Sequence, residues 1–309
     1  ETRATLDLDP LNLEAFHPWM PGIKLYGTPR LNLELTGDRQ QQNLTLTLQE
    51  ENQFLSISGW IRDIKTDPRY QMTLKVDGLD GEHWTGNPEF KSWIVGKLNA
   101  SGQGFELQDN SLTLSGEFGD IRYGEYELDD LVLQMDKKKG TLKGNVTGDT
   151  WFGRVNSEFT MEKIFDEPVY SIHSALNHID LSKLTKNKEL QTDLNLNLAV
   201  NGEGIRADNL NTEVDIELWD SYFLDKPVSN MNMSVLYDKG QYSLYGFHLN
   251  TPYAAVGAEG EGHLRGNNQV KFEFLPKNMR GLAEILNLPK MDMKGAVTGE
   301  VDGKVDSLN

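Results

Sequence analysis

The histidines and the acidic pairs are the side chains of this sequence that could do chemistry. Six histidines are spread along the chain and cysteine is absent, so thiolate nucleophiles and zinc–thiolate sites cannot form. His173 and His178 are five residues apart, and an extended strand would place them on opposite faces. No His-Glu-x-x-His or comparable ligand spacing occurs. The histidines therefore indicate solvated strand faces and turns and no metal site.

Two carboxylate pairs could act in proton transfer, and one acidic segment could bind calcium. Asp129-Asp130 and the Asp7/Asp9 pair resemble the paired carboxylates of general acid–base catalysis, but an acidic chain produces such pairs by chance. The segment from Asp77 to Gly81 resembles the start of a calcium loop, but Pro88 stands where the bidentate Glu at loop position 12 belongs. We therefore predict no catalytic residue, no cofactor and no metal, and a protein that is not an enzyme.

The composition and net charge of the chain indicate which classes of binding partner it does not suit. The 309 residues include 30 Lys plus Arg against 47 Asp plus Glu, a net charge of −17. Nucleic acid is a poor partner for such a chain, because binding to phosphate needs clustered cations. Hydrophobic residues make up 38%, too many for a disordered chain. The run Lys137-Lys138-Lys139 before Gly140 is typical of a hairpin tip whose charges oppose aggregation.

The dominant pattern of the sequence is alternation of apolar and polar residues with a period of two. Leu31, Leu33 and Leu35, for example, alternate with Asn32 and Glu34. Strict alternation is typical of a strand with one dry and one wet face, and about 22 strands of ordinary length fit the chain. Parallel strands would read as continuous apolar runs, and short helical patterns occur only at 11–16, 180–185 and 279–287. The sequence thus predicts an all-β protein, an elongated antiparallel sheet with few short helices.

So few helices cannot cover the apolar faces of so many strands. The sheet must close into a barrel, pack as a sandwich or curl into a trough. The interior is then either a filled core or an open groove, and the sequence leaves both open. The residues with the strongest claim to line it are Leu131, Leu133, Met135, Leu194, Leu196, Leu198, Val214, Ile216, Leu218, Met231, Met233, Val235, Val270, Phe272 and Phe274.

An internal repeat divides the chain. Residues 66–104 and 166–204 share nine identical residues at an offset of 100, among them Asp80/Asp180 and Gly102/Gly202. We interpret the chain as a partial repeat (1–66), two repeat units (67–166 and 167–274) and a second partial repeat (275–309), all in one continuous elongated domain. Neither end looks like a polar cap, so we expect an internal excerpt of a longer protein. The repeated glycines are expected to mark bulges or bends.

The repeat residues resemble a known family. The unit reads as Pro-x-Tyr, a hydrophobic-Asp-Leu-x-x-Leu turn and Gly-x-Gly, seen here in 167–170, 179–184 and 200–204. This resembles the TamB branch of the AsmA-like bacterial envelope proteins, which are of the repeating β-groove type. The first copy departs from the pattern, because Asp80-Gly-Glu-His-Trp84 replaces the leucines, so a short helix is not expected there.

The resemblance implies a place and a role. The fold would be a long β-trough (β-taco) in the periplasm, with an inner-membrane anchor outside this chain. The function would be that of a conduit or scaffold carrying phospholipid acyl chains in an apolar groove between the inner and outer membranes. Phospholipid would be the ligand, and an outer-membrane barrel protein of the assembly type would be a partner through regions outside this chain. The alternative is an assembly scaffold for outer-membrane protein insertion, with a filled β-core and no lipid transport.

Overall fold

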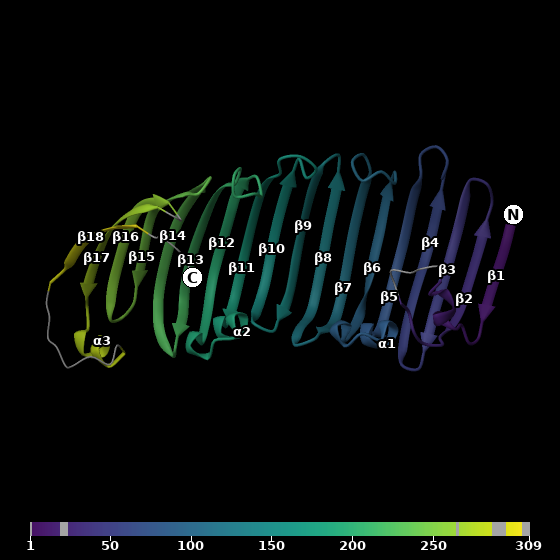
Figure 1. Ribbon diagram of the computed structural model, residues 1–309, viewed down its shortest axis with the longest axis horizontal. Helices are drawn as coiled ribbons and strands as arrows, with labels where there is room; N and C mark the ends of the chain where they lie inside the picture. The colour runs from purple at the N-terminus through teal and green to yellow at the C-terminus, as the bar shows by residue number, and fades with distance from the viewer. Residues whose placement is uncertain (1, 19–23, 264–265, 286–294, 305–309) are drawn as a thin grey trace. The chain divides into compact units, whose positions relative to one another are not determined.

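The computed structural model describes residues 2–18, 24–263, 266–285 and 295–304. The chain forms two compact units, residues 1–151 and 152–309, each with nine strands (Figure 1). Unit 1 contains β1 (Thr2–Leu8), β2 (Arg30–Gly37), β3 (Gln41–Glu50), β4 (Gln53–Arg62), β5 (Arg69–Leu79), β6 (Ser92–Gln103), β7 (Ser111–Tyr123), β8 (Tyr126–Lys138) and β9 (Thr141–Thr150). Its short helices are η1 (Leu13–Phe16), α1 (Gly81–Thr85) and η2 (Pro88–Phe90).

Unit 2 is built in the same way. Its strands are β10 (Gly153–Glu162), β11 (Val169–Ile179), β12 (Thr192–Glu203), β13 (Asn211–Phe223), β14 (Lys226–Asp238), β15 (Gln241–Asn250), β16 (Ala254–His263), β17 (Asn267–Pro276) and β18 (Val297–Lys304). Its helices are α2 (Leu181–Thr185), η3 (Lys188–Leu190) and α3 (Met279–Ile285). Of the predicted segment 279–287, residues 286–287 lie outside the described residues.

Within each unit every strand pairs antiparallel with the next strand in the sequence, so each unit is a single layer. Within each unit the sheet is curled and unclosed, and only 8% of the chain is helical in the part that the structure describes. The all-β, antiparallel fold with few short helices is therefore confirmed. The 18 described strands are fewer than the expected 22 or so, because most run for 10–13 residues and exceed the typical strand.

The element order repeats every six strands. A short helix precedes the sixth strand each time: α1 before β6, α2 before β12 and α3 before β18. Ladders repeat as well, since Leu33 lies opposite Leu46 and, 100 residues later, Leu133 lies opposite Val146. The sequence repeat thus corresponds to a repeat of six strands in the structure: β1–β6, β7–β12 and β13–β18. This six-strand repeat is a different division of the chain from the two compact units.

The expectation that the first copy lacks its helix is wrong. Asp80 caps α1 by accepting a hydrogen bond from the backbone N–H of Glu82 at 3.0 Å, and Gly86 ends the helix in the left-handed region. An Asx cap and a C-terminal glycine are sufficient for one helical turn. The hydrophobic-Asp-Leu-x-x-Leu pattern is therefore not required for it.

Of the two alternatives expected for Gly102 and Gly202, a bulge or a bend, the bulge is wrong. Both lie in regular ladders, and the register shifts fall instead between Val76 and Leu79 and between Leu176 and Ile179. A Cβ on Gly102 would lie 2.6 Å from the hydroxyl of Tyr70. The glycine therefore makes room for the aromatic ring of the neighbouring strand.

Candidate functional site: the apolar face of each unit

The apolar face of unit 2 is built from side chains that meet across neighbouring strands. Ile216 on β13 lies directly opposite Leu198 on β12 and Met233 on β14. Directly opposite residues of an antiparallel pair share a face. The other predicted lining residues that meet on this face of β12–β14 are Leu196, Val214, Leu218, Met231 and Val235, and Val200 lies on the same face opposite Val214.

The same face continues to both sides of these three strands. A ladder of directly opposite residues runs from Met233 through Phe247 and Ala258 to Phe272 on β17. Val270 and Phe274 flank Phe272 on this face, opposite Gly260 and Val256. On the β11 side, Leu194 lies opposite Ile179 beyond the bulge. All predicted lining residues of unit 2 therefore lie on one face of its sheet.

The three lining residues predicted in β8 belong to unit 1. Leu131, Leu133 and Met135 lie opposite Phe118, Gly116 and Leu114 of β7. They thus lie on the apolar face of their own unit. That they share one interior with the lining residues of unit 2 stays a prediction.

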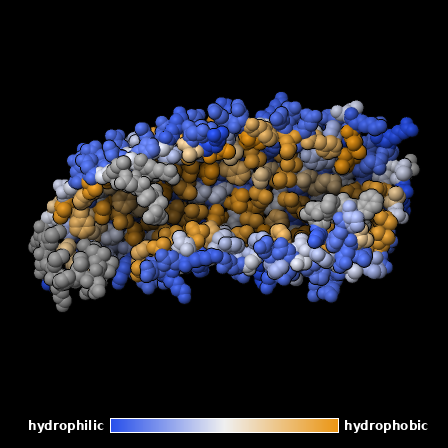
Figure 2. Space-filling model, viewed as in Figure 1, coloured by the Kyte–Doolittle hydropathy of each residue, from blue (hydrophilic) through white to orange (hydrophobic). Residues whose placement is uncertain are grey.

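Side-chain exposure distinguishes these faces from an ordinary core. Of the predicted lining residues, only Leu218 is buried, at 7% exposed, and the others are half-buried. In the part of the chain that the structure describes, buried hydrophobic residues are few and scattered. Figure 2 shows that each unit, taken by itself, gathers apolar side chains on a hollowed face with hydrophilic margins. A filled core would bury most of these side chains fully.

At one margin of unit 1 the apolar side chains are covered by another segment of the chain. We call this segment, residues 9–18 and 24–29 between β1 and β2, the strap. Its two parts are joined by a hydrogen bond of 2.8 Å from the backbone N–H of Leu11 to the carbonyl of Pro29. Leu11 and Leu13 of the strap pack with Trp84 of α1 in a buried cluster. The partly buried residues around this cluster are Leu8, Leu25, Leu31, Leu48 and Leu79. The strap therefore covers the apolar face at the end where α1 lies.

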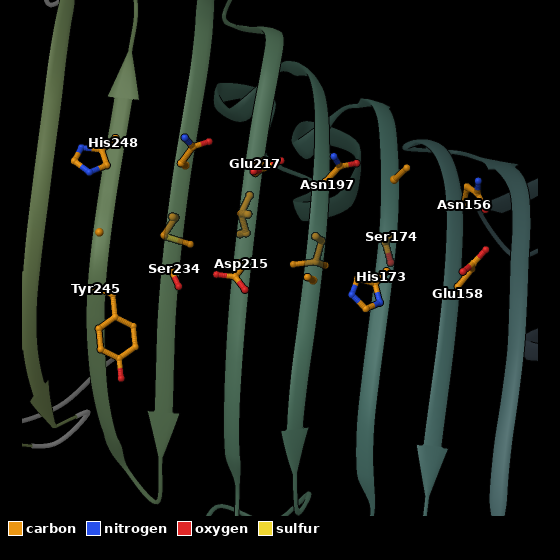
Figure 3. A pocket seen from close by; sticks show the side chains of 17 residues that line it. Asn156, Glu158, His173, Ser174, Asn197, Asp215, Glu217, Ser234, Tyr245 and His248 are labelled. Atoms are coloured by element: carbon orange, nitrogen blue, oxygen red, sulfur yellow. The ribbon is translucent and has the colours of Figure 1, made fainter.

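A hollow on the polar face of unit 2 was missed by sequence reasoning. It measures about 820 Å³ and crosses β10 to β15. Its floor includes the small residues Ala175, Ala199 and Gly246. Figure 3 shows polar side chains around it; those labelled are Asn156, Glu158, His173, Ser174, Asn197, Asp215, Glu217, Ser234, Tyr245 and His248.

Lys137 departs from the expected hairpin tip. Its residue position lies opposite Leu112 and Leu142 on the apolar face of unit 1. The residue is only 7% exposed, and its Nζ donates to the backbone O of Asn110 at 3.1 Å and also to the Asn110 side chain. Lys138 and Lys139 are exposed, as expected. The hydrogen bonds from Lys137 satisfy an ammonium group that would otherwise be costly to bury.

The sequence candidates for chemistry do not assemble into one site. Asp7 and Asp9 lie near Arg30, with closest N–O distances of 3.3 and 3.9 Å. His178 Nδ1 lies 3.0 Å from Asp193 Oδ1. Among the described residues no group of three or more His, Asp or Glu side chains is arranged to hold a metal ion.

Asp180, which caps α2 in unit 2, is a carboxylate whose pKa is shifted. Partial burial tends to raise the pKa of Asp180, but hydrogen bonds from Ser182 and from the Thr192 backbone, with the charge of Lys183, bring that pKa below its usual value. Ser182 Oγ donates to Asp180 Oδ1 at 2.6 Å and the Ser182 backbone N–H does so at 3.0 Å. The carboxylate is thus a structural cap.

In the described parts of the chain, no helix has the length and apolarity needed to cross a membrane. Comparison with protein-family models, with curated proteins and with solved structures finds no match.

Proposed function

We propose that the apolar face of each unit holds the acyl chains of phospholipid. On this proposal the chain belongs to the TamB branch of the AsmA-like envelope proteins and works in the periplasm, with its inner-membrane anchor outside this chain. Lipid would move between the inner and outer membranes along the sheet. An outer-membrane barrel protein would be contacted through other regions of the longer protein.

The observation that carries the proposal is the half-buried state of the apolar faces. Rows of Leu, Ile, Val, Met and Phe extend across strand after strand, yet nearly all remain partly exposed. Contiguous exposed apolar patches on soluble monomers rarely exceed a few hundred Å². A face of this kind needs an apolar occupant, and an acyl chain gains about 0.8 kcal/mol per buried CH₂ group.

The margins of the faces support the same occupant. The strand ends and turns carry hydrophilic side chains along both borders of the apolar strip (Figure 2). A phospholipid has the matching division, since its tails can lie on the apolar strip while its headgroup stays in water. An apolar peptide segment would leave backbone polar groups to be satisfied, which an acyl chain does not.

The first experiment asks whether the purified protein carries lipid. Native mass spectrometry and lipid extraction should detect bound phospholipid at reproducible stoichiometry. Protein purified free of lipid that takes up none from vesicles would contradict the proposal.

The second experiment uses neighbouring residues on opposite faces. Met233 is half-buried on the apolar face between Ile216 and Phe247, whereas Asn232 is exposed on the polar face between Glu217 and His248. A photo-crosslinking residue at position 233 should label phospholipid, and one at 232 should not. Equal labelling at both positions would contradict a lipid-binding face.

The substitution Met233→Asp tests transport, with Asn232→Asp as the matched control. A carboxylate facing hydrocarbon without a partner costs several kcal/mol, so Met233→Asp should block lipid transfer while the protein stays folded, and Asn232→Asp should not. The half-buried side chain can turn its carboxylate toward water, which preserves the fold. A Met233→Asp protein that unfolds would favour the assembly scaffold with a filled core.

A further inference from the structure

The hollow on the polar face of unit 2 is a candidate binding site of its own, because it lies on the opposite side of the sheet from the apolar face. Its volume of about 820 Å³ is within the range of small-molecule sites. The hollow crosses the six strands from β10 to β15, which span about 24 Å at the usual spacing between strands. This length suits a linear molecule that lies across the strands.

The floor of the hollow is specific to unit 2. At the offset of 100, Ala175 and Asn197 stand where the first copy of the repeat has Lys75 and Lys97. The ladders agree, since Ala175 lies opposite Asn197 and Lys75 lies opposite Lys97. Both lysines are exposed on the polar face of unit 1. The same backbone therefore carries two long side chains in unit 1 and an open floor in unit 2.

The polar groups around the hollow are available to a ligand. The lining contains the carboxylates of Glu158, Asp215 and Glu217 and neither lysine nor arginine. In the part of the chain that the structure describes, no other side chain forms a hydrogen bond or an ion pair with these three carboxylates. Asn197 and Asn232 lie on either side of Glu217 in one row. Their amides both donate and accept hydrogen bonds.

An aromatic ring stands at one side of the hollow. The pairing of β15 with β14 passes from Gly246 to Leu244 and skips Tyr245, which is thus the extra residue of a β-bulge. Bulges re-aim a side chain, and Figure 3 shows Tyr245 beside the labelled polar side chains. Tyr245 is 60% exposed. The corresponding strand of the first repeat, β3, pairs with β2 without a register shift, so this bulge is not part of the common repeat.

The chemistry of the lining selects one class of ligand. Three carboxylates without a cation oppose an anionic ligand. Among the described residues no group of three or more His, Asp or Glu side chains is arranged to hold a metal ion. A simple cation would use the carboxylates but would leave the amide donors of Asn197 and Asn232 without an acceptor. A chain of hydroxyl groups matches both, because each hydroxyl donates one hydrogen bond and accepts two.

We propose that this hollow binds a neutral, linear oligosaccharide, which lies across β10–β15. Its hydroxyl groups bond to the carboxylates and amides, and the apolar face of one sugar ring lies on the exposed ring of Tyr245, whose body is apolar and whose tip is polar. The proposal does not depend on what the apolar face of the sheet binds.

Isothermal titration calorimetry with three neutral hexasaccharides tests the proposal. The three are maltohexaose, cellohexaose and N-acetylchitohexaose, and at least one of them should bind. Its affinity should be the same at low and high salt, because screening acts only on charged ligands. Spermidine, a linear cation, is the comparison. Binding of none of the three sugars, or binding of spermidine alone, would overturn the proposal.

The substitution Ala175→Lys tests where the sugar binds. It gives unit 2 the residue that the first copy has at position 75, so the protein should stay folded while the long side chain fills the floor. Binding should fall at least tenfold. Asn230→Lys is the matched control, because Asn230 is exposed opposite Trp219 and is not part of the lining. Equal affinities for the Ala175→Lys and wild-type proteins would overturn the proposed site.

Replacing Tyr245 gives an independent measure, because this side chain is exposed and its loss should leave the fold intact. Tyr245→Ala should weaken binding about twofold to tenfold, the range expected for one aromatic contact. Tyr245→Phe keeps the ring and should bind nearly as tightly as the wild type. A Tyr245→Ala protein with unchanged affinity, or equal losses for the two variants, would overturn the contact between the sugar and the ring.

Discussion

The two units differ most at the ends where α1 and α2 lie, although their backbones there are nearly the same. Asp80 and Asp180 cap α1 and α2 in the same way, each accepting a hydrogen bond from the backbone N–H two residues on. The 3-10 turns that follow are both capped by an asparagine, Asn87 or Asn187. One local fold has therefore been kept in both units.

The covering of these two ends is different. In unit 1 the strap buries Trp84 to 9% exposed, and the backbone N–H of Tyr26 donates to the carbonyl of Trp84 at 2.9 Å. In unit 2 the corresponding residue is Leu184, which is 49% exposed. The repeat thus sets the backbone, while one connection between two strands determines whether the end of the apolar face is covered.

The largest effect that would separate the two ends comes from removing the covered side chain. Trp84→Ala should destabilise unit 1 by about 3–5 kcal/mol, the usual cost of truncating a buried aromatic residue. Urea denaturation would measure this loss. Hydrogen exchange by mass spectrometry should show faster exchange in α1 and the strap, with α2 unchanged.

Leu184→Ala is the matched change in unit 2. Since Leu184 is half exposed, its truncation should cost within about 0.5 kcal/mol. Equal losses for the two variants would mean that the strap adds nothing to the stability of unit 1.

The next largest loss of stability is expected at Gln53, whose side chain has no counterpart in unit 2. Gln53 is 8% exposed, and its Oε1 accepts from the backbone N–H of Asp80 at 2.9 Å and from Trp84 Nε1 at 2.5 Å. In unit 2 glycine stands at the same place, 153, and the N–H of Asp180 donates to the carbonyl of Phe152 at 2.7 Å.

Gln53→Ala should therefore cost about 1–3 kcal/mol, because it leaves buried donors without an acceptor. Gln53→Glu keeps an acceptor and should cost less. Urea denaturation would compare the two, and similar losses for both would contradict the role of the Oε1 acceptor.

The sequence predicted the faces of the strands well, because alternation is a local property. Val214, Ile216 and Leu218 can be assigned to one face from their spacing alone, and the ladders place them there. The helix α1 was missed although Asp80 and Gly86, an Asx cap and a left-handed stop, were both readable. The leucine pattern of residues 179–184 is absent from the first copy, but the two capping residues are enough for the helix without it.

Features that depend on register could not be predicted. The floor of the polar hollow forms because Ala175, Ala199 and Gly246 come from three different strands, and their alignment is set by long-range pairing. Lys137 is buried for the same reason, since Asn110, its acceptor, lies directly before the preceding strand, β7. A one-dimensional pattern carries no information about such pairs.

A smaller effect should come from the residue that ends each helix. Gly86 and Lys186 both have positive φ, 63° and 57°. A Cβ on Gly86 would also lie 2.8 Å from a ring atom of Tyr26 in the strap. Gly86→Ala should thus cost about 1–2 kcal/mol through the left-handed backbone alone, and the ring contact adds to this.

Lys186→Ala is the control for that substitution. It exchanges one residue with a Cβ for another, so the left-handed strain is unchanged and the loss of stability should be smaller than for Gly86→Ala. Thermal unfolding would compare the two variants. A Gly86→Ala protein as stable as the wild type would show that the strap yields to the added methyl group.

The last loss of stability should be the same in both units, because the two helices are capped by an aspartate in the same way. Removing an Asx cap costs about 1 kcal/mol, so Asp80→Ala and Asp180→Ala should each lose about that much. The pKa of Asp180 is below its ordinary value of 3.8, against the opposing influence of partial burial, because Ser182, the Thr192 backbone and Lys183 favour the carboxylate.

Acid should remove this contribution in a defined direction. A carboxyl group with a lowered folded pKa stabilises the fold fully above its unfolded pKa, and this stability is lost as pH falls below about 4 and through the folded pKa. The difference in unfolding free energy between wild type and Asp180→Ala should therefore be full at neutral pH and shrink in acid. Urea denaturation at pH 6 and in acid would measure it. A difference that grew on acidification would mean that protonated Asp180, not the carboxylate, is the stabilising form.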